Sequence, residues 1–192
     1  MPTKSHNVTR RATCPRSPSP VPHEHKAWPG TVSISAKTLF AIITDIQHSL
    51  RASRINKLVL INAHGGNYVL SNVVQEATVT ERCMALFPTN THWNAARAKA
   101  NMETSSHEDM HAGELEVSIL LATHPELVRE GFETVDHVAD DRQDLLTVGL
   151  EAYTKNAVIG RPSLATAEKG RAVLDYLGAA FRSCLRSIDI AP

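Results

Sequence analysis

The chain of 192 residues is long enough for one well-buried domain and too short for two comfortable ones. Basic and acidic side chains number 20 each, so no net field attracts nucleic acid or an anionic membrane, and no apolar run approaches the roughly 20 residues of a membrane helix. Cys14, Cys83 and Cys184 are odd in number and far apart, which argues against a disulfide framework and favours a reducing cytoplasm. We therefore expect a cytoplasmic protein whose partner is a small molecule.

The N-terminal part of the chain contains three segments of different composition. Residues 1–20 carry four basic and no acidic side chains and end in Ser-Pro-Ser-Pro, a composition typical of a disordered tail. Residues 21–33 read as a loop closed by a Pro-Gly turn. Apolar side chains then recur at helical spacing over residues 36–52, which predicts an amphipathic helix that covers a sheet. We therefore divide the chain into a basic tail and a domain over residues 21–192.

The next segment has the pattern of a buried strand that ends in a functional turn. Large aliphatic residues dominate 57–62, and His64 follows, beside Gly65 and Gly66 and before Asn67. Imidazole is the commonest neutral metal ligand, and glycine lets a backbone pass close to a ligand, so this turn predicts a metal or substrate site. The alternative is a glycine-rich turn with an asparagine cap and a bystander histidine.

The alternation of helices and strands indicates the fold class. A helix is predicted over about 68–82 and a second strand over 84–87. Helix, strand, helix, strand is the order that builds a parallel sheet covered by helices, so we expect an α/β fold. Ligands bind such sheets outside the carboxyl ends of the strands, where residues 62–67 and 89–93 both fall.

The C-terminal half mixes irregular and helical segments. Residues 94–110 have little apolar periodicity and read as a lid or loop. A helix is expected over 110–122, ending near His124 because the residue before a proline is disfavoured in the α region. An irregular segment over 131–162 leads to a last helix at about 165–188.

A second group of polar residues falls at the start of the helix expected from residue 110. His111, Glu114 and Glu116 would face the same crevice as His64. A metal hydrolase needs such a set, with imidazole and carboxylate to hold the ion and a group near neutral pKa to move protons. Acids in the first turn of a helix are also favoured by the helix dipole alone, so each glutamate by itself is weak evidence.

Two motifs in order carry a resemblance to a known family. Asn62-Ala63-His64-Gly65-Gly66-Asn67 precedes His111-Ala112-Gly113-Glu114-Leu115-Glu116-Val117-Ser118. Together they resemble the creatininase family of metal-dependent amidohydrolases, over about residue 21 to the end. The supporting segments are His25 with Pro29-Gly30-Thr31-Val32-Ser33, Pro125-Glu126-Leu127-Val128-Arg129, and Gly160-Arg161-Pro162 to Glu168-Lys169-Gly170.

The resemblance implies a three-layer α/β/α domain with a mainly parallel sheet, usually in a homo-oligomer. It also implies two divalent metals per site, zinc or manganese, with a bridging water that attacks an amide carbonyl. His64 and Glu116 match metal ligands, with Glu114 as the alternative to Glu116. His111 matches the catalytic residue suspected of proton transfer to the leaving nitrogen. Gly65, Gly66 and Asn67 would shape the site, and Trp93 would line the substrate pocket or simply pack.

The sequence departs from the family at its N-terminal end. Family members carry a first strand and a loop with a Glu-x-His pair and a later Asp, which residues 1–20 do not show. Glu24 and His25 match a later loop and are not expected to replace these ligands. We therefore expect a creatininase-like domain without its first strand and loop, acting on a cyclic amide or small amide C–N bond through an incomplete metal site. The alternative is a catalytically inactive subunit or small-ligand-binding module.

Overall fold

The computed structural model describes residues 23–189, and the predicted basic tail lies outside them. No helix within these residues is long and apolar enough to cross a membrane. Short 3-10 helices connect the main elements, of which η1 (His23–His25) belongs to the site described below. The main elements are α1 (Ala36–Ala52), β1 (Leu58–Ile61), α2 (Val69–Ala77), β2 (Met84–Phe87), α3 (Asn90–Lys99), α4 (Glu114–Thr123), α5 (Leu145–Val148) and α6 (Ala167–Asp189).

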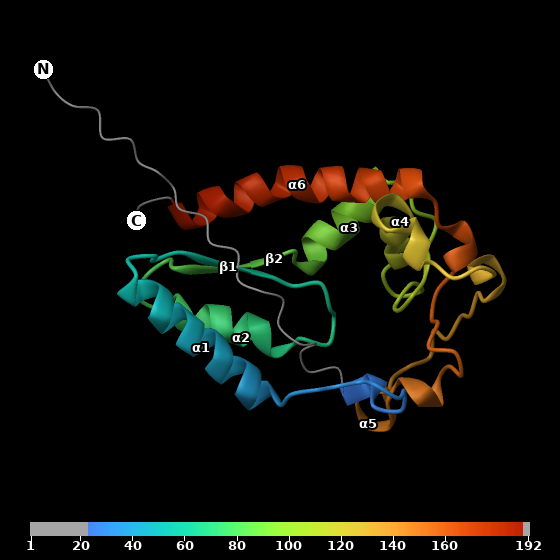
Figure 1. Cartoon of the computed structure of the whole chain (residues 1–192), viewed down its shortest axis with the longest axis horizontal. Helices are drawn as coiled ribbons and strands as arrows, with labels where there is room; N and C mark the ends of the chain where they lie inside the picture. The colour runs from blue at the N-terminus through green and yellow to red at the C-terminus, as the bar shows by residue number, and fades with distance from the viewer. Residues whose placement is uncertain (1–22, 190–192) are drawn as a thin grey trace, which may run out of the picture.

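The two strands form a parallel pair that lies between helices in the left half of Figure 1. Leu58 pairs with Met84 and Ile61 with Phe87, so both carboxyl ends reach the same edge. The chain returns from β1 to β2 through α2, as parallel strands require. The functional turn predicted after β1 therefore begins at the edge where ligands bind in this class of fold.

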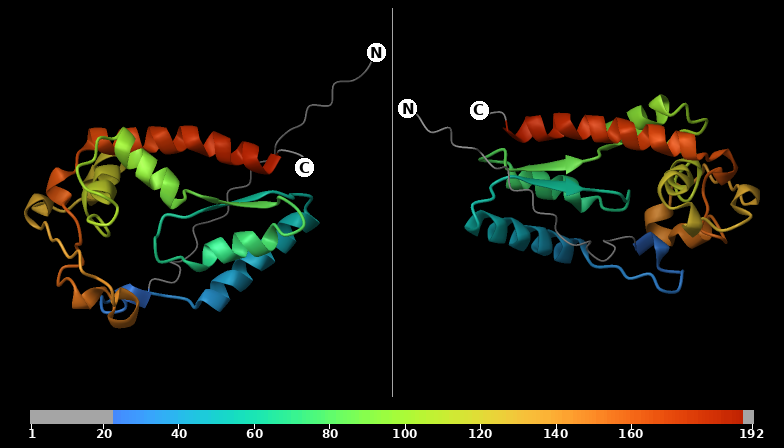
Figure 2. Two further views of the ribbon diagram at one scale, coloured as in Figure 1. Left: turned by 180° about the vertical axis from the view of Figure 1, so that it is seen from behind. Right: turned by 45° about the horizontal axis from the view of Figure 1, so that its top comes forward.

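Helices cover both faces of the strand pair, as Figures 1 and 2 show: α1 and α2 lie on one side, α3 and α6 on the other. Because neighbouring side chains of a strand point to opposite faces, Leu58 and Leu60 pack with the α1–α2 cluster and Val59 packs with the α3–α6 cluster. The predicted three-layer α/β/α class is confirmed.

The helices α4 and α6 pack closely because one residue between them has no side chain. A Cβ atom built on Gly170 would collide with the carbonyl oxygen of Ser118. The Ser118 hydroxyl in turn accepts a hydrogen bond from the backbone N–H of Thr166 at 3.1 Å. The middle of α4 is thus fixed against the start of α6.

Three boundaries differ from the sequence-based expectation. The lid or loop expected over 94–110 is wrong for its first part, because α3 runs through Lys99; its small alanines bury little area and hide the helical period. The helix α2 ends at Ala77, where the β-branched residues of 78–80 begin. The helix α4 starts at Glu114 because Ala112, with φ of 54°, interrupts the helical backbone before it.

Candidate metal and hydrolase site

The turn after β1 is a closed hydrogen-bonded unit. Asn62 Oδ1 accepts from the backbone N–H of His64 at 3.2 Å and from Asn67 Nδ2 at 2.9 Å. The N–H of Gly66 donates to His64 Nδ1 at 2.9 Å. Asn67 is buried, and its Oδ1 has no partner within residues 23–189. The two asparagines therefore hold His64 at the end of the strand.

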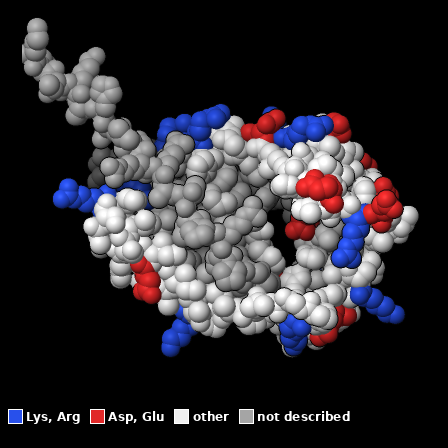
Figure 3. All heavy atoms as spheres, in the orientation of Figure 1, with Lys and Arg blue, Asp and Glu red and all other residues white. Residues whose placement is uncertain are grey.

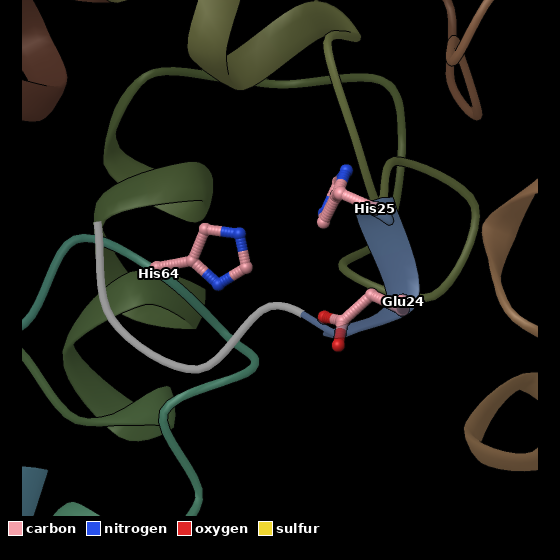
Figure 4. Close-up of side chains that lie close together, drawn as sticks. All are labelled: Glu24, His25 and His64. Carbon is pink, nitrogen blue, oxygen red and sulfur yellow. The ribbon is translucent and has the colours of Figure 1, made fainter. Parts of the chain in front are cut away.

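The 3-10 helix η1 brings two further metal-binding side chains to this turn. Ligand atoms of Glu24, His25 and His64 all lie within 4.8 Å of one another. Figure 4 shows the three side chains pointing toward a common space from η1 and from the β1–α2 turn. The loop after η1, which carries Glu24 and His25, is closed by the Thr31 hydroxyl, which donates to the carbonyl of His25 at 3.1 Å. Glu24 and His25, which were not expected to replace the missing family ligands, thus lie beside His64.

His111 lies beside this group. Its ring centroid is 4.6 Å from that of His25, and its backbone forms a bridge with Ile159. Its Nδ1 lies 2.6 Å from the carbonyl oxygen of Ala157. Because a carbonyl only accepts, Nδ1 carries the proton, and in the neutral ring Nε2 is free to accept a proton, which it can then pass on.

A buried ion pair holds the backbone that carries His111. Asp109 Oδ2 lies 2.8 Å from Arg97 Nη2 and accepts from the N–H of Leu115 at 2.9 Å, so it also caps the start of α4. Both members of the pair are buried. The Asp109 carboxylate fits only because Gly113 and Gly160 have no Cβ to collide with it.

Burial and neighbouring charges affect the ionisation of His25. Burial lowers the pKa of this imidazole most, and the neighbouring His111 and His64 lower it further, while Glu24 raises it. The neutral form, which binds metals, is therefore favoured at His25.

The two glutamates of the second motif have different surroundings. Glu116 is exposed in the first turn of α4, where its Oε2 accepts from the N–H of Ala112 at 2.5 Å. It does not belong to the group of ligand atoms around His64. Glu114 is fully buried, 2.5 Å from Lys169 Nζ, and accepts hydrogen bonds from the hydroxyl and N–H of Thr104 and the N–H of Glu103. Its carboxylate is thus already engaged by hydrogen bonds and an ion pair within the fold.

Trp93 lies in α3, where the structure places it against the apolar cluster around Phe87. The sequence was compatible with a pocket-lining role or a packing role for Trp93. Its position in the structure agrees with the packing role.

A family model described as "Creatininase: Creatinine amidohydrolase" matches residues 5–185. This chain belongs to the creatininase family. The resemblance read from the two motifs is confirmed. The match begins at residue 5, inside the segment 1–20 that was predicted from its composition to be a disordered tail.

Relatives and solved structures agree with this assignment. The chain is 30% identical over 154 residues to the mycofactocin precursor peptide peptidase of Mycobacterium ulcerans (strain Agy99), covering 78% of this chain and 56% of the relative. It is 28% identical over 173 residues to the protein of that name from Mycobacterium tuberculosis (strain ATCC 25618 / H37Rv), covering 86% and 60%. This chain thus spans somewhat more than half the length of these relatives.

Solved creatininases share the fold. A structure described as "Creatininase Mn" matches with a TM-score of 0.67 at 21% identity, over 86% of this chain and 68% of the other. A creatininase variant complexed with creatine matches with a TM-score of 0.65 at 23% identity, over 83% and 68%.

The residues around His64 fit one divalent cation of the kind that the creatininase resemblance implies. Two imidazoles and one carboxylate are the protein ligands of several catalytic zinc sites, which leave a fourth position for water. Residues 23–189 contain no second group of three such ligands at this spacing. Coordination through His64 Nδ1 would replace the hydrogen bond from Gly66, at a cost of about 0.5–1.5 kcal/mol.

Gly66 shapes the site by its lack of a side chain. A Cβ at this position would lie 2.5 Å from Glu24 Oε1 and 3.1 Å from the His64 ring. We expect Gly66→Ala to weaken zinc binding by about 10- to 100-fold, because both ligands must move. Isothermal titration calorimetry measures this. Gly65→Ala is the matched control, since a Cβ there meets nothing within 4 Å. Equal affinities for the two variants would contradict the geometry.

Proposed function

We propose that this chain is a metal-dependent hydrolase of an amide C–N bond, with one divalent cation held by Glu24, His25 and His64. The observation that carries the proposal is the convergence of these three ligand side chains, with His111 beside them. Zinc and manganese are the candidate ions. Glu116 is then a helix-capping residue rather than a ligand.

The chain's own side chains divide the work of such a hydrolysis. A divalent cation, when bound, would polarise the amide carbonyl and lower the pKa of water. Hydrolysis adds a hydroxyl group to the carbonyl carbon, breaks the C–N bond and transfers a proton to the leaving nitrogen. His111 would take up at Nε2 the proton that water loses and pass it to that nitrogen, since its Nδ1 is committed to Ala157.

The names of the relatives support a proposal for the substrate class. Curated relatives are named peptide peptidases, and similar solved structures are creatininases, one of them complexed with creatine. We propose a peptide or small amide as the substrate of this chain. A homo-oligomeric assembly and a cytoplasmic location remain predictions from the sequence.

The experiment uses the purified full chain, loaded with zinc or manganese, on short blocked peptides and on creatinine. We expect hydrolysis of at least one class. We also expect His111→Asn to lower kcat by about 10²- to 10⁴-fold while leaving the metal content unchanged, because it removes a proton donor and not a ligand. His48→Asn is the control, since this exposed histidine of α1 lies outside the cluster of Glu24, His25 and His64.

Three outcomes would contradict the proposal or one part of it. If the chain binds no metal, the ligand assignment fails. If it binds stoichiometric metal and hydrolyses none of these substrates, the alternative of an inactive subunit or small-ligand-binding module is favoured. A kcat of His111→Asn equal to that of the parent chain would remove His111 from the proton-transfer step.

A further inference from the structure

A second feature of the structure is a pocket of about 370 Å³ that no step above uses. Cavities of about 300–1,000 Å³ are the size that binds small molecules or parts of larger ones. Its apolar wall comes from Tyr68, Met110 and Leu145, and its polar wall from the loop over 140–143 together with His107. The pocket therefore joins the N-terminal end of α2 to the loops before α4 and α5.

The pocket lies next to the proposed metal site. Met110 directly precedes His111, and Tyr68 directly follows Asn67 in the turn that carries His64. Burial, and after it the charge of Glu24, raises the pKa of the Tyr68 hydroxyl, so the carboxylate lies within electrostatic reach of this wall. Because these wall residues adjoin the site in the chain, a substrate bound at the metal site can extend into the pocket. Figure 3 shows one face of the molecule, with an opening to the right of its centre.

The polar wall of the pocket carries no uncompensated charge. The Arg142 side chain is only 8% exposed and lies 3.9 Å from Asp140 Oδ1. Its guanidinium also donates to the carbonyl of Ala139 and, at 2.7 Å, to the carbonyl of His107. The His107 ring is bonded in turn to the Asp140 carbonyl at 2.9 Å. Because these donors and charges are paired with one another, the pocket does not favour a charged group.

From this placement we propose that the pocket binds an uncharged, apolar side chain of a peptide substrate, on the residue whose nitrogen leaves. We assign the pocket to the leaving side of the scissile bond because Met110, which lines the pocket, directly precedes His111, the residue that delivers the proton to the leaving nitrogen. The inference rests on the proposed function and adds a substrate preference to it. Leu145 is then a specificity-determining residue.

The test compares blocked dipeptides, acetyl-Gly-X-amide, by the mass-spectrometric release of X-amide. We expect kcat/KM to be at least about 10-fold higher for X as leucine or phenylalanine than for aspartate or lysine. Leu145→Trp, which fills the pocket, should lower kcat/KM for leucine and phenylalanine by about 10-fold and leave that for glycine nearly unchanged. Leu145→Lys should raise the relative rate for aspartate.

Leu146→Trp is the matched control, because Leu146 is the next residue and is 76% exposed. A readout independent of turnover is the binding of phenylalanine amide to the zinc-loaded chain by calorimetry, which Leu145→Trp should weaken and Leu146→Trp should not. Hydrolysis without side-chain preference, with equal behaviour of the two tryptophan variants, overturns the pocket assignment and leaves the proposed function intact. Specific binding of the amide without any hydrolysis supports the pocket and overturns the proposed function.

Discussion

Replacing His64 with alanine should leave the purified chain almost free of divalent metal, whereas the parent chain should bind close to one ion per chain. Three protein ligands are available, Glu24, His25 and His64, and losing one leaves two, which hold an ion weakly. We expect zinc affinity to fall by on the order of 100-fold or more, since even partners outside the ligand set are worth about 10- to 100-fold. Glu24→Gln should have a similar effect. Elemental analysis and zinc titration measure both.

The controls separate this site from the one that the sequence motifs favoured. His23→Ala removes an exposed histidine from the same 3-10 helix and should leave zinc binding unchanged. Glu116→Gln should also leave it unchanged, because that carboxylate lies outside the ligand group. A large loss of metal in Glu116→Gln with none in Glu24→Gln would instead establish the ligand set predicted from the sequence.

Local patterns in the sequence were sufficient to predict the centre of the fold. The aliphatic run before Asn62 predicted β1, and the helical spacing over 36–52 predicted α1 with the boundaries that the structure shows. His64 could be singled out because its turn combines glycines, asparagines and a strand end in one short stretch. Such features depend only on neighbouring residues, so they can be predicted from the sequence.

The approach of η1 to this turn could not be read from the sequence. Nearly forty residues separate His25 from His64, and only the packing of the intervening helix and strand brings the two rings to a centroid distance of 5.4 Å. The one signal within the sequence was the acid between two histidines, His23-Glu24-His25, at the start of a loop closed by a turn. Because Glu24 and His25 resemble a later loop of the family, they were not predicted to be ligands.

The roles of Glu114 and Glu116 were undecided for a geometric reason. A separation of two residues on a helix corresponds to about 200° of rotation, so the two side chains point in nearly opposite directions. Which one faces the interior depends on where α6 packs, and hence on Lys169, more than fifty residues later. The sequence supplies both glutamates but no information on the rotation of α4.

Glu114 is accordingly expected to matter for stability. The buried carboxylate joins the start of α4 to the loop at Thr104 and to Lys169 of α6, which also lies 3.2 Å from Glu103. Burial alone would raise the pKa of the Glu114 carboxyl, but the hydrogen bonds from Lys169, Thr104 and Glu103 outweigh it and hold that pKa below its ordinary value. The charged form is therefore the one that the folded chain stabilises.

We expect Glu114→Gln to lower the free energy of unfolding by about 1.5–3 kcal/mol, because Lys169 loses its buried partner while it keeps Glu103 at 3.2 Å. Domains are typically stable by only about 5–15 kcal/mol, so chemical denaturation should show a large shift of the midpoint. Glu133→Gln, at an exposed position, should change stability by less than about 0.5 kcal/mol. Lys169→Met in the Glu114→Gln background should recover part of the loss, since the ammonium group is then removed together with its buried partner.

The same carboxylate predicts how stability depends on pH. Because folding lowers the pKa of Glu114, its contribution is complete above the ordinary glutamate value of about 4.5 and is lost as the pH falls through the lower, folded-state pKa. The parent chain should therefore lose stability below that value more steeply than Glu114→Gln does. Denaturation curves between about pH 7 and pH 3 measure the difference, and parallel losses in the two proteins would show that Glu114 is not ionised in the folded chain.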